Sequence, residues 1–302
     1  MTAPIVVTGI ASVLPSPEQP FASQVDPTPF LTVRKSRKYL SPQDDLAVVA
    51  AANALQKSSM TRGHLGLRAG LAVCVGYLSF DRKDTDPVLA VSVEDERFSM
   101  RRFSSEGMRK THPLLTFRCL PNMPAFHVSV NFDLRGPYFC TYPSAAQTYT
   151  AIQRAIDWID DDEADVVLVG AVAHQRNFLV EHHLARLEHP VAPKDLRDAG
   201  AVIVLERRSR AEARGAAPLA IVERPSVRYK PRVPYAPGAP APYERWRFDK
   251  LHDEPLAAGD FGCAAPLVQL ERWIERRQRG LWEHDAQTRD GAALESAWEV
   301  LA

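Results

Sequence analysis

The sequence has few of the features that mark secreted, metal-bound or membrane proteins. Its 302 residues include only four cysteines, which are widely spaced and form no CxxC pair, so neither a disulfide framework nor a structural zinc site is expected. It has no run of about 18 apolar residues, so no membrane span is expected. The opening stretch MTAPIVVTGIASVLP lacks a basic segment before its apolar residues, unlike a secretory signal peptide. We therefore expect a soluble, cytoplasmic protein.

An excess of charge of one sign is also lacking. Lys and Arg total 37, Asp and Glu total 37, and the isoelectric point is about 7.1. This balance excludes a basic field over the whole surface, so no nucleic-acid partner is expected. Apolar residues make up 45% of the chain, which is enough for a sizeable core in one large domain or two packed halves.

Short apolar runs alternate with helical patterns along the chain. The runs predict buried strands, and the recurrence of apolar residues every three or four positions predicts helices between them. This alternation indicates a layered α/β protein. No periodic pattern is evident at residues 80–110, and the proline-rich stretch 225–245 is expected to be a linker or loop. The expected strands are 4–10, 69–77, 138–142, 164–173, 199–206 and 217–223, and the expected helices are 41–58, 144–160, 207–215, 262–279 and 292–301.

One segment carries a recognisable order of motifs. Residues 136–172 read GPYFCTYPSAAQTYTAIQRAIDWIDDDEADVVLVGAV, which gives a Gly-Pro turn, a strand, a helix that starts with small residues, and a Val/Leu-rich strand. This order resembles the centre of a β-ketoacyl synthase of the thiolase superfamily. Flanking pieces agree in order: VVTGI, PNMPAFHVSVNFDLRGP, RDAGAVIVLERRSRAEARGA and GDFGCAAPLVQLERWIE.

The resemblance implies a fold and a division of the chain. We expect a thiolase-like layered α-β-α fold whose C-terminal half is truncated and degenerate. Residues 1–210 would form the N-terminal ketosynthase-like half. Residues 211–302 would form the degenerate half, with the proline-rich linker near 225–245.

The family's catalytic groups do not appear at the matching positions. A condensing ketosynthase needs a thiolate at a helix N-terminus and two histidines that stabilise the thioester oxyanion and the decarboxylating malonyl group. Counted without gaps, the cysteine position falls on Ala145, and the histidine of the Gly-His turn falls on Asp260. The chain has no His-Gly-Thr stretch. The resemblance therefore implies a chain without the condensing triad.

Two residues keep an enzymatic alternative open. Gln147 is of interest because some ketosynthase relatives carry glutamine in place of the cysteine, either as decarboxylases or as silent partners. It lies two positions past Ala145, and it is otherwise a polar residue at the start of a helix. Ser144 is either a nucleophile or the N-cap of the helix, and the N-cap is the favoured reading because PSAAQ lacks the G-x-S-x-G elbow.

The other chemistry-bearing side chains have plainer interpretations. Cys140 and Cys263 are expected to be small packing residues, and the three histidines at 182, 183 and 189 are expected on a solvated helix face. The arginines of 207–214 and 276–279 are also expected on solvated faces, with contact to an acidic carrier protein as the alternative. No metal and no cofactor are expected.

Two function classes follow from these observations. In the first, the chain resembles the short chain length factors of type II and aryl polyene polyketide systems, non-catalytic subunits that pair with an active ketosynthase and shape its acyl cavity. Such a chain would form a heterodimer with the ketosynthase and meet acyl carrier protein through that complex. In the second, it is a malonyl-carrier-protein decarboxylase or acyltransferase relative that uses Gln147 or Ser144.

The resemblance also suggests where the partner would bind. The family pairs the strand before the nucleophile across a two-fold axis, and here that strand is Tyr138, Phe139, Cys140, Thr141 and Tyr142. The segment before Gly-Pro reaches toward the partner's pocket in the family. Its bulky residues would then limit chain length, unless they are ordinary core residues. These candidate gate residues are Phe117, Arg118, Met123 and Phe126.

Overall fold

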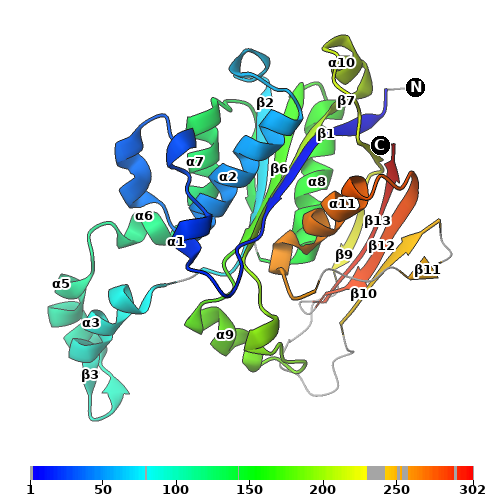
Figure 1. The fold of residues 1–302 in the computed structure, drawn as a ribbon. Coiled ribbons are helices and arrows are strands. Elements are labelled where there is room, and N and C mark those ends of the chain that lie inside the picture. Colours follow the sequence, from blue (N-terminus) through cyan, green and yellow to red (C-terminus); the bar gives the residue numbers. More distant parts are fainter. Residues whose placement is uncertain are drawn as a thin grey trace.

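A mixed β-sheet built from both ends of the chain runs through the middle of the protein (Figure 1). The structure, a computed structural model, describes residues 3–78, 80–141, 143–229, 242–249, 252–253, 258–288 and 291–301. Within these residues the strand order is β11-β10-β12-β13-β8-β1-β7-β6-β2-β5, and β9 also pairs with β13. The pairs β2–β5 and β2–β6 are parallel, whereas the other ladders are antiparallel.

Four strands form the buried centre of the sheet. They are β1 (Ile5–Val13), β2 (Ala69–Val75), β6 (Val166–Ala173) and β7 (Ala199–Arg207). The side chains of β2 and β6 are buried on both faces, as their unbroken apolar sequences predict. The expected strands are confirmed, and they lie in one sheet. The short β5 (Tyr138–Thr141) closes one edge of this sheet.

Helices cover the central strands on both faces, which gives the expected α-β-α layers (Figure 1). On one face α2 (Pro42–Lys57) and α7 (Met123–Phe132) pack against the sheet, and on the other α8 (Ala145–Asp160) and α11 (Ala265–Glu275) do so. Ser41 caps α2 as predicted, in a capping box that Asp44 completes. Alternate residues of each strand therefore face two separate apolar layers.

Helix α2 lies very close to the sheet because two strand positions are glycine. A Cβ atom on Gly9 of β1 would overlap the Ala54 carbonyl oxygen, and one on Gly200 of β7 would lie 2.8 Å from Leu46 Cβ. Real Cβ atoms do not approach other atoms this closely. The two glycines therefore set the distance between this helix and the sheet.

The C-terminal part of the chain extends the sheet by antiparallel strands. These are β8 (Ala220–Val222), β9 (Ser226–Tyr229), β10 (Tyr243–Phe248), β11 (His252–Asp253), β12 (Gly280–Gln287) and β13 (Ala292–Val300). The helix predicted over 292–301 is wrong. Buried and exposed residues alternate strictly in AALESAWEV, which is the period of a strand with one face in the core.

Two further expectations for this part need correction. The stretch 225–245 contains the strand β9 and the start of β10, although residues 230–241 lie outside the described residues. The helix predicted over 262–279 ends at Glu275, and a turn leads from it into β12. The outer face of this sheet carries charged side chains such as Arg245 and Asp285, which are cross-strand partners.

Residues 82–110, which have no clear pattern in the sequence, form a separate arm that projects from the body (Figure 1). The arm consists of α3 (Arg82–Ser92), the two-residue strands β3 (Val93–Glu94) and β4 (Arg97–Phe98), α4 (Met100–Arg102), a π-helical turn (Phe103–Gly107) and α5 (Met108–Lys110). Apart from α3, the elements of the arm have only two to five residues, too few to produce a readable period. The helix α6 (Leu115–Cys119) leads back to the body.

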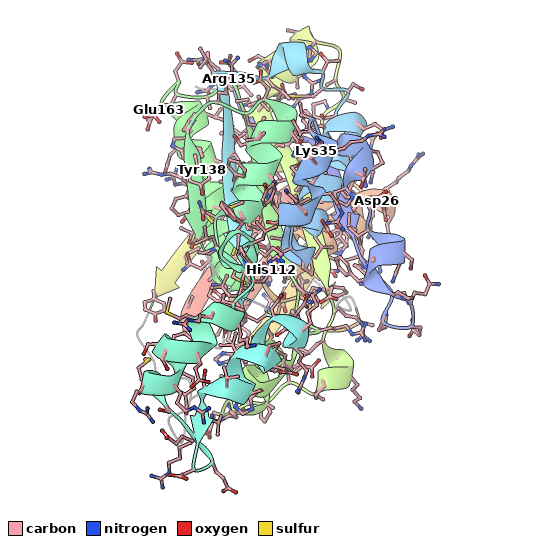
Figure 2. The ribbon with its side chains drawn as sticks, turned by 90° about the vertical axis from the view of Figure 1, so that its left-hand side faces the viewer. Asp26, Lys35, His112, Arg135, Tyr138 and Glu163 are labelled. Carbon is pink, nitrogen blue, oxygen red and sulfur yellow. The ribbon has the colours of Figure 1, made fainter. Side chains whose placement is uncertain are left out.

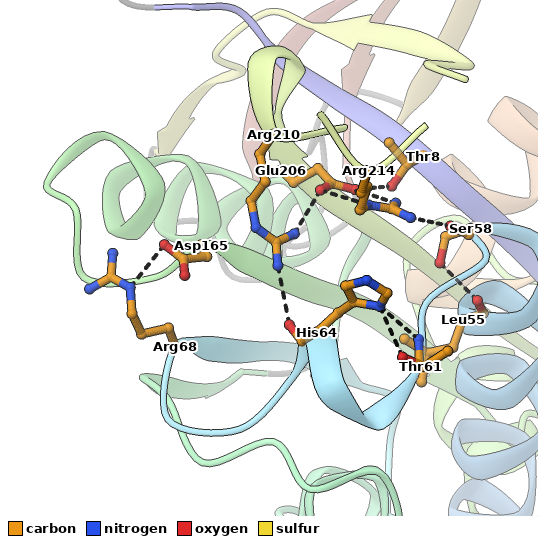
Figure 3. A network of polar contacts seen from close by, with 10 residues as sticks. All are labelled: Thr8, Leu55, Ser58, Thr61, His64, Arg68, Asp165, Glu206, Arg210 and Arg214. Carbon is orange, nitrogen blue, oxygen red and sulfur yellow. Dashed lines mark hydrogen bonds and ion pairs between the residues drawn. The ribbon is translucent and has the colours of Figure 1, made fainter. Parts of the chain in front are cut away.

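A buried carboxylate joins the sheet to its surroundings at the end opposite the arm. Glu206 of β7 is fully buried, and it accepts hydrogen bonds from Arg210 (2.7 Å), Arg214 (2.6 Å) and Thr8 (2.7 Å), as Figure 3 shows. The prediction of a solvated face for the arginines of 207–214 is therefore wrong for Arg210 and Arg214. They lie on or just after α10 (Arg208–Ala213), and their charges compensate Glu206.

The remaining described elements are short. They are α1 (Phe21–Gln24), α9 (Phe178–Ala185) and the 3₁₀ turns Thr28–Phe30, Arg34–Tyr39, Arg62–His64, Pro193–Asp195 and Gly262–Ala264. Among the residues that the structure describes, no helix combines the length and apolar character that a membrane crossing requires.

Candidate functional site

The N-terminus of α8 is placed by the strand that precedes it. β5 lies beside β2 in parallel register, and the chain then passes Pro143 and enters the helix at Ala145. Ser144 occupies the N-cap position with extended backbone, as predicted, and its carbonyl accepts the first helical hydrogen bonds. Its hydroxyl makes no capping bond and has no hydrogen-bond partner among the described residues.

A cavity of about 580 Å³ opens at this helix N-terminus. Ser144 and Ala145 line one side, and the loop with Asp260 lines another. The structure therefore brings together the two positions that the sequence resemblance is expected to match to a cysteine and a histidine, although 115 positions separate them in the sequence. Gln147 is not among the described lining residues. Its side-chain oxygen instead accepts a hydrogen bond of 2.6 Å from the Thr141 hydroxyl.

The carboxylate of Asp260 holds the loop that leads into α11. It accepts hydrogen bonds from the Gly262 backbone N–H (2.9 Å) and from the Gln175 side-chain amide (3.1 Å). Gly262 has a φ of +56°, a left-handed conformation that glycine adopts easily. Asp260 therefore stabilises this turn, because its carboxylate accepts a backbone hydrogen bond much as an N-cap residue does. An imidazole at this position would not be needed for that structural role.

A second group of polar residues lines the cavity, and sequence reasoning missed it. His284 on β12 is almost fully buried, and its Nδ1 lies 2.6 Å from the Tyr149 hydroxyl of α8. Its Nε2 lies 3.2 Å from the carboxylate of Glu244 on β10, which also accepts a hydrogen bond from the Trp246 indole at 3.0 Å. The signal was available: His284 is the one ionisable residue on the apolar face of β12.

The charged side chains that line the described part of the cavity are all acidic. Asp195, Glu244 and Asp260 contribute carboxylates, and the described lining residues include no lysine or arginine. Burial lowers the pKa of His284, although Glu244 acts in the opposite direction, so His284 is neutral near pH 7. An anionic group such as a malonyl carboxylate would therefore meet like charges here, without a cation to bind it.

Two thiols that the sequence singled out lie in buried or partly buried surroundings. Burial raises the pKa of Cys140 to about 11, so it is a neutral thiol at pH 7. Cys263 is fully buried, and its Sγ lies 3.4 Å from the Val172 carbonyl oxygen. In the described part of the chain, no group of three or more His, Cys, Asp or Glu side chains is arranged to hold a metal ion.

The predicted interface strand lies at the open edge of the sheet. β5 pairs only with β2 among the described strands, and Tyr138 is 51% exposed on the side of the molecule shown in Figure 2. The Leu71 N–H donates to the Pro137 carbonyl, which fixes the alternation: the backbone groups of Phe139 face β2, and those of Tyr138 and Cys140 face outward. Tyr142 lies outside the described residues.

The four candidate gate residues lie in different surroundings. Phe117 of α6 and Phe126 of α7 are about half exposed, whereas Met123 is buried. Arg118 is largely buried and forms an ion pair of 3.0 Å with Asp84 of the arm. None of the four is among the described residues that line the cavity at α8, and their role as a gate stays a prediction.

Comparison with solved structures identifies the fold. One chain of a complex described as AntDE:AntF, a type II PKS acyl-carrier protein with its ketosynthase bound to the hexaketide, matches with a TM-score of 0.69 and 14% identity over 100% of both chains. A β-ketoacyl synthase from Burkholderia phymatum STM815 matches with a TM-score of 0.63 and 13% identity over 99% of this chain and 100% of that one. These likenesses show a shared, thiolase-like fold.

Another match is partial. The ishigamide ketosynthase/chain length factor has a TM-score of 0.55 and 18% identity over 75% of this chain and 64% of that chain. A search of curated proteins finds no match. A family model for the β-ketoacyl synthase N-terminal domain matches residues 17–188, more than half of the chain. The chain therefore belongs to the β-ketoacyl synthase family.

Proposed function

We propose that this chain is a non-catalytic, ketosynthase-like subunit of the chain length factor type. It pairs with a catalytic ketosynthase in the cytoplasm, shapes the acyl cavity of that partner during polyketide or polyene synthesis, and meets acyl carrier protein through the complex. The observation that carries the proposal is the open edge of β5. It is supported by the nearby cavity, which Ala145 and Asp260 line at the positions that the sequence resemblance would give to a cysteine and a histidine.

The open edge supports partner binding on physical grounds. The outward backbone groups of Tyr138 and Cys140 have no strand to pair with in the described chain. An unpaired edge of this kind favours addition of a strand from another protein. Exposed apolar side chains of α7, Phe126 and Val130, lie one helical turn apart and add hydrophobic surface. A ketosynthase that offers its own edge strand would satisfy both features.

The enzymatic alternative has weaker support. Gln147 is engaged with Thr141 and does not line the cavity, and Ser144 has no histidine or carboxylate among its hydrogen-bond partners. A serine needs such a base to become a nucleophile. The carboxylate-lined cavity would also disfavour the malonyl anion that a decarboxylase binds.

Strand pairing through β5 can be tested by co-expression with a catalytic ketosynthase taken from the same organism as this chain. We expect a one-to-one complex on size-exclusion chromatography with light scattering. Cys140→Pro should abolish it, because proline removes an outward N–H while the bonds to β2 remain. Cys140→Ala is the matched control: it removes the same side chain, keeps the N–H, and should bind normally.

Three results would contradict the proposal. The first is a wild-type chain that forms no complex with the ketosynthase. The second is a Cys140→Pro variant that folds, as judged by circular dichroism, and binds as tightly as Cys140→Ala. The third is acyl transfer to the isolated chain, seen by intact-mass spectrometry, or decarboxylation of malonyl-carrier protein by the chain alone; this result would favour the enzymatic alternative.

A further inference from the structure

The arm, residues 82–110, exposes an unusual amount of apolar surface. Met100 is 68% exposed, Met108 is 59% exposed and Phe98 is 53% exposed. Leu89 and Val93 of the same arm are also largely exposed. Single exposed apolar residues are common, but several on one short projecting segment mark an interaction surface. Methionine suits such a surface because its flexible side chain adapts to a partner.

The arm has its own internal packing, so its exposed apolar side chains belong to a folded segment. Phe98 and Phe103 are ring neighbours, with centroids 5.7 Å apart, and a Cβ atom on Gly107 would overlap the buried Ser92. Polar contacts fasten the base of the arm to the body. Arg118 of α6 pairs with Asp84, and the Asn177 side chain donates to the Phe80 carbonyl at 2.8 Å. The tip therefore projects from a fixed base.

The position of the arm relative to the open edge of β5 indicates which protein would cover its apolar side chains. β2 and β5 are parallel, so their carboxyl ends lie at the same edge of the sheet, and the arm begins only seven residues after β2 ends. In Figure 2 Tyr138 and His112, which directly follows the arm, are seen from the same side of the molecule. Phe117 and Leu120 of the segment that connects the arm to α7 are exposed as well.

We infer that the arm clasps the ketosynthase subunit that pairs with β5, so that Phe98, Met100 and Met108 bury their side chains against an apolar patch of that partner. This inference rests on the proposed function. Antiparallel pairing across β5 would place the amino end of the partner's strand beside the carboxyl end of β5, on the side from which the arm projects. The contact surface is then the strand edge together with the arm.

The experiment measures the affinity of the complex with the co-expressed ketosynthase. The double variant Met100→Gln/Met108→Gln keeps side-chain length, and both positions are exposed, so folding should be unaffected. We expect the Kd to rise about tenfold or more, because two apolar contacts are lost. Tyr229→Gln is the control: Tyr229 is 58% exposed on β9, far from β5 in the strand order, and the change should leave the Kd unchanged.

Limited proteolysis gives a second readout that needs no variant. Arg97, Arg101 and Arg109 are exposed in the arm, so trypsin should cut the free chain there and cut the complex more slowly. If the wild type binds and Cys140→Pro does not, but the arm variant binds normally and the arm is cut equally fast in the complex, the arm inference is wrong and the proposed function stands. If the wild type forms no complex, both are overturned.

Discussion

Two adjacent carboxylates are buried at the start of α2. Asp44 completes the capping box with Ser41, and Asp45 forms an ion pair of 2.9 Å with Arg37. Burial raises the pKa of both groups to about 7, and the bonds to Ser41 and Arg37 offset only part of that effect. Each group therefore holds its proton more tightly in the folded chain than in the unfolded chain, where the pKa has its ordinary value of 3.8.

This difference gives a pH prediction. The stability that a raised pKa contributes is fully present below the unfolded value and is lost as the pH rises through the folded value. Asp45→Asn removes that dependence, so the free energy of unfolding of the variant, relative to wild type, should increase between pH 5 and pH 8. Urea unfolding at several pH values measures it. A flat profile for Asp45→Asn would refute the argument.

Sequence reasoning identified several residues of the candidate site but not which residues lie next to them in the fold. Ala145 and Asp260 could be named from the family resemblance, yet only the fold shows that they share a cavity. His284 and Glu244 were missed because they lie 40 positions apart on neighbouring strands, a pairing that depends on register. Arg210 and Arg214 were misjudged for a different reason: their partner Glu206 is close in sequence, but it lies in an apolar strand that gives no sign of a buried charge.

At the scale of helices and strands, the close contact between α2 and the sheet leaves no room for a side chain at Gly9. Gly9→Ala would drive a methyl group into the Ala54 carbonyl, and neither backbone can move without disturbing the capped helix or the β1–β7 ladder. We expect a loss of about 1–3 kcal/mol in the free energy of unfolding. Gly63→Ala is the control, because its Cβ would have 3.7 Å of clearance and its φ is not positive. Equal stability of both variants would show that the helix can shift freely.

Helices and strands were predictable where the pattern of apolar residues stayed the same over several positions. The apolar strands β2 and β6, the apolar first seven residues of β7 and the capped helix α2 were all evident. β13 was mistaken for a helix because alanine, leucine and glutamate favour helices. Its alternation of buried and exposed residues determines the structure only because neighbouring strands are present to pair with it. The arm was not predicted, because most of its elements have two to five residues and show no period, and because its one longer helix, α3, is charged and contains Pro87.

At the scale of the whole molecule, one core spans both ends of the chain. The layer under α8 continues from the central strands to four fully buried tryptophans on β10, α11, β12 and β13: Trp246, Trp273, Trp282 and Trp298. Trp273 stacks on Trp282 with centroids 4.1 Å apart, and β8 pairs with both β1 and β13. The division at residue 210 therefore crosses a shared core, and the two sides should not be independent.

We expect the chain to unfold in a single step. Tryptophan fluorescence mainly reports the C-terminal part, because four of the five tryptophans lie there, whereas far-ultraviolet circular dichroism reports every helix. In urea the two transitions should coincide within error, as a shared core requires. An earlier fluorescence transition would mean that residues 211–302 form a separate unit, in agreement with the boundary expected from the sequence.

The open edge of β5 also has a consequence for how the chain is made. A newly synthesised copy presents the unpaired edge of β5 to every other copy, and such edges join readily into non-native assemblies. On the proposed function, copies made in excess of the ketosynthase would be lost to self-association, and the scarcer subunit would set the yield of useful protein. Balanced synthesis of the two proposed subunits would then matter more than a high level of either.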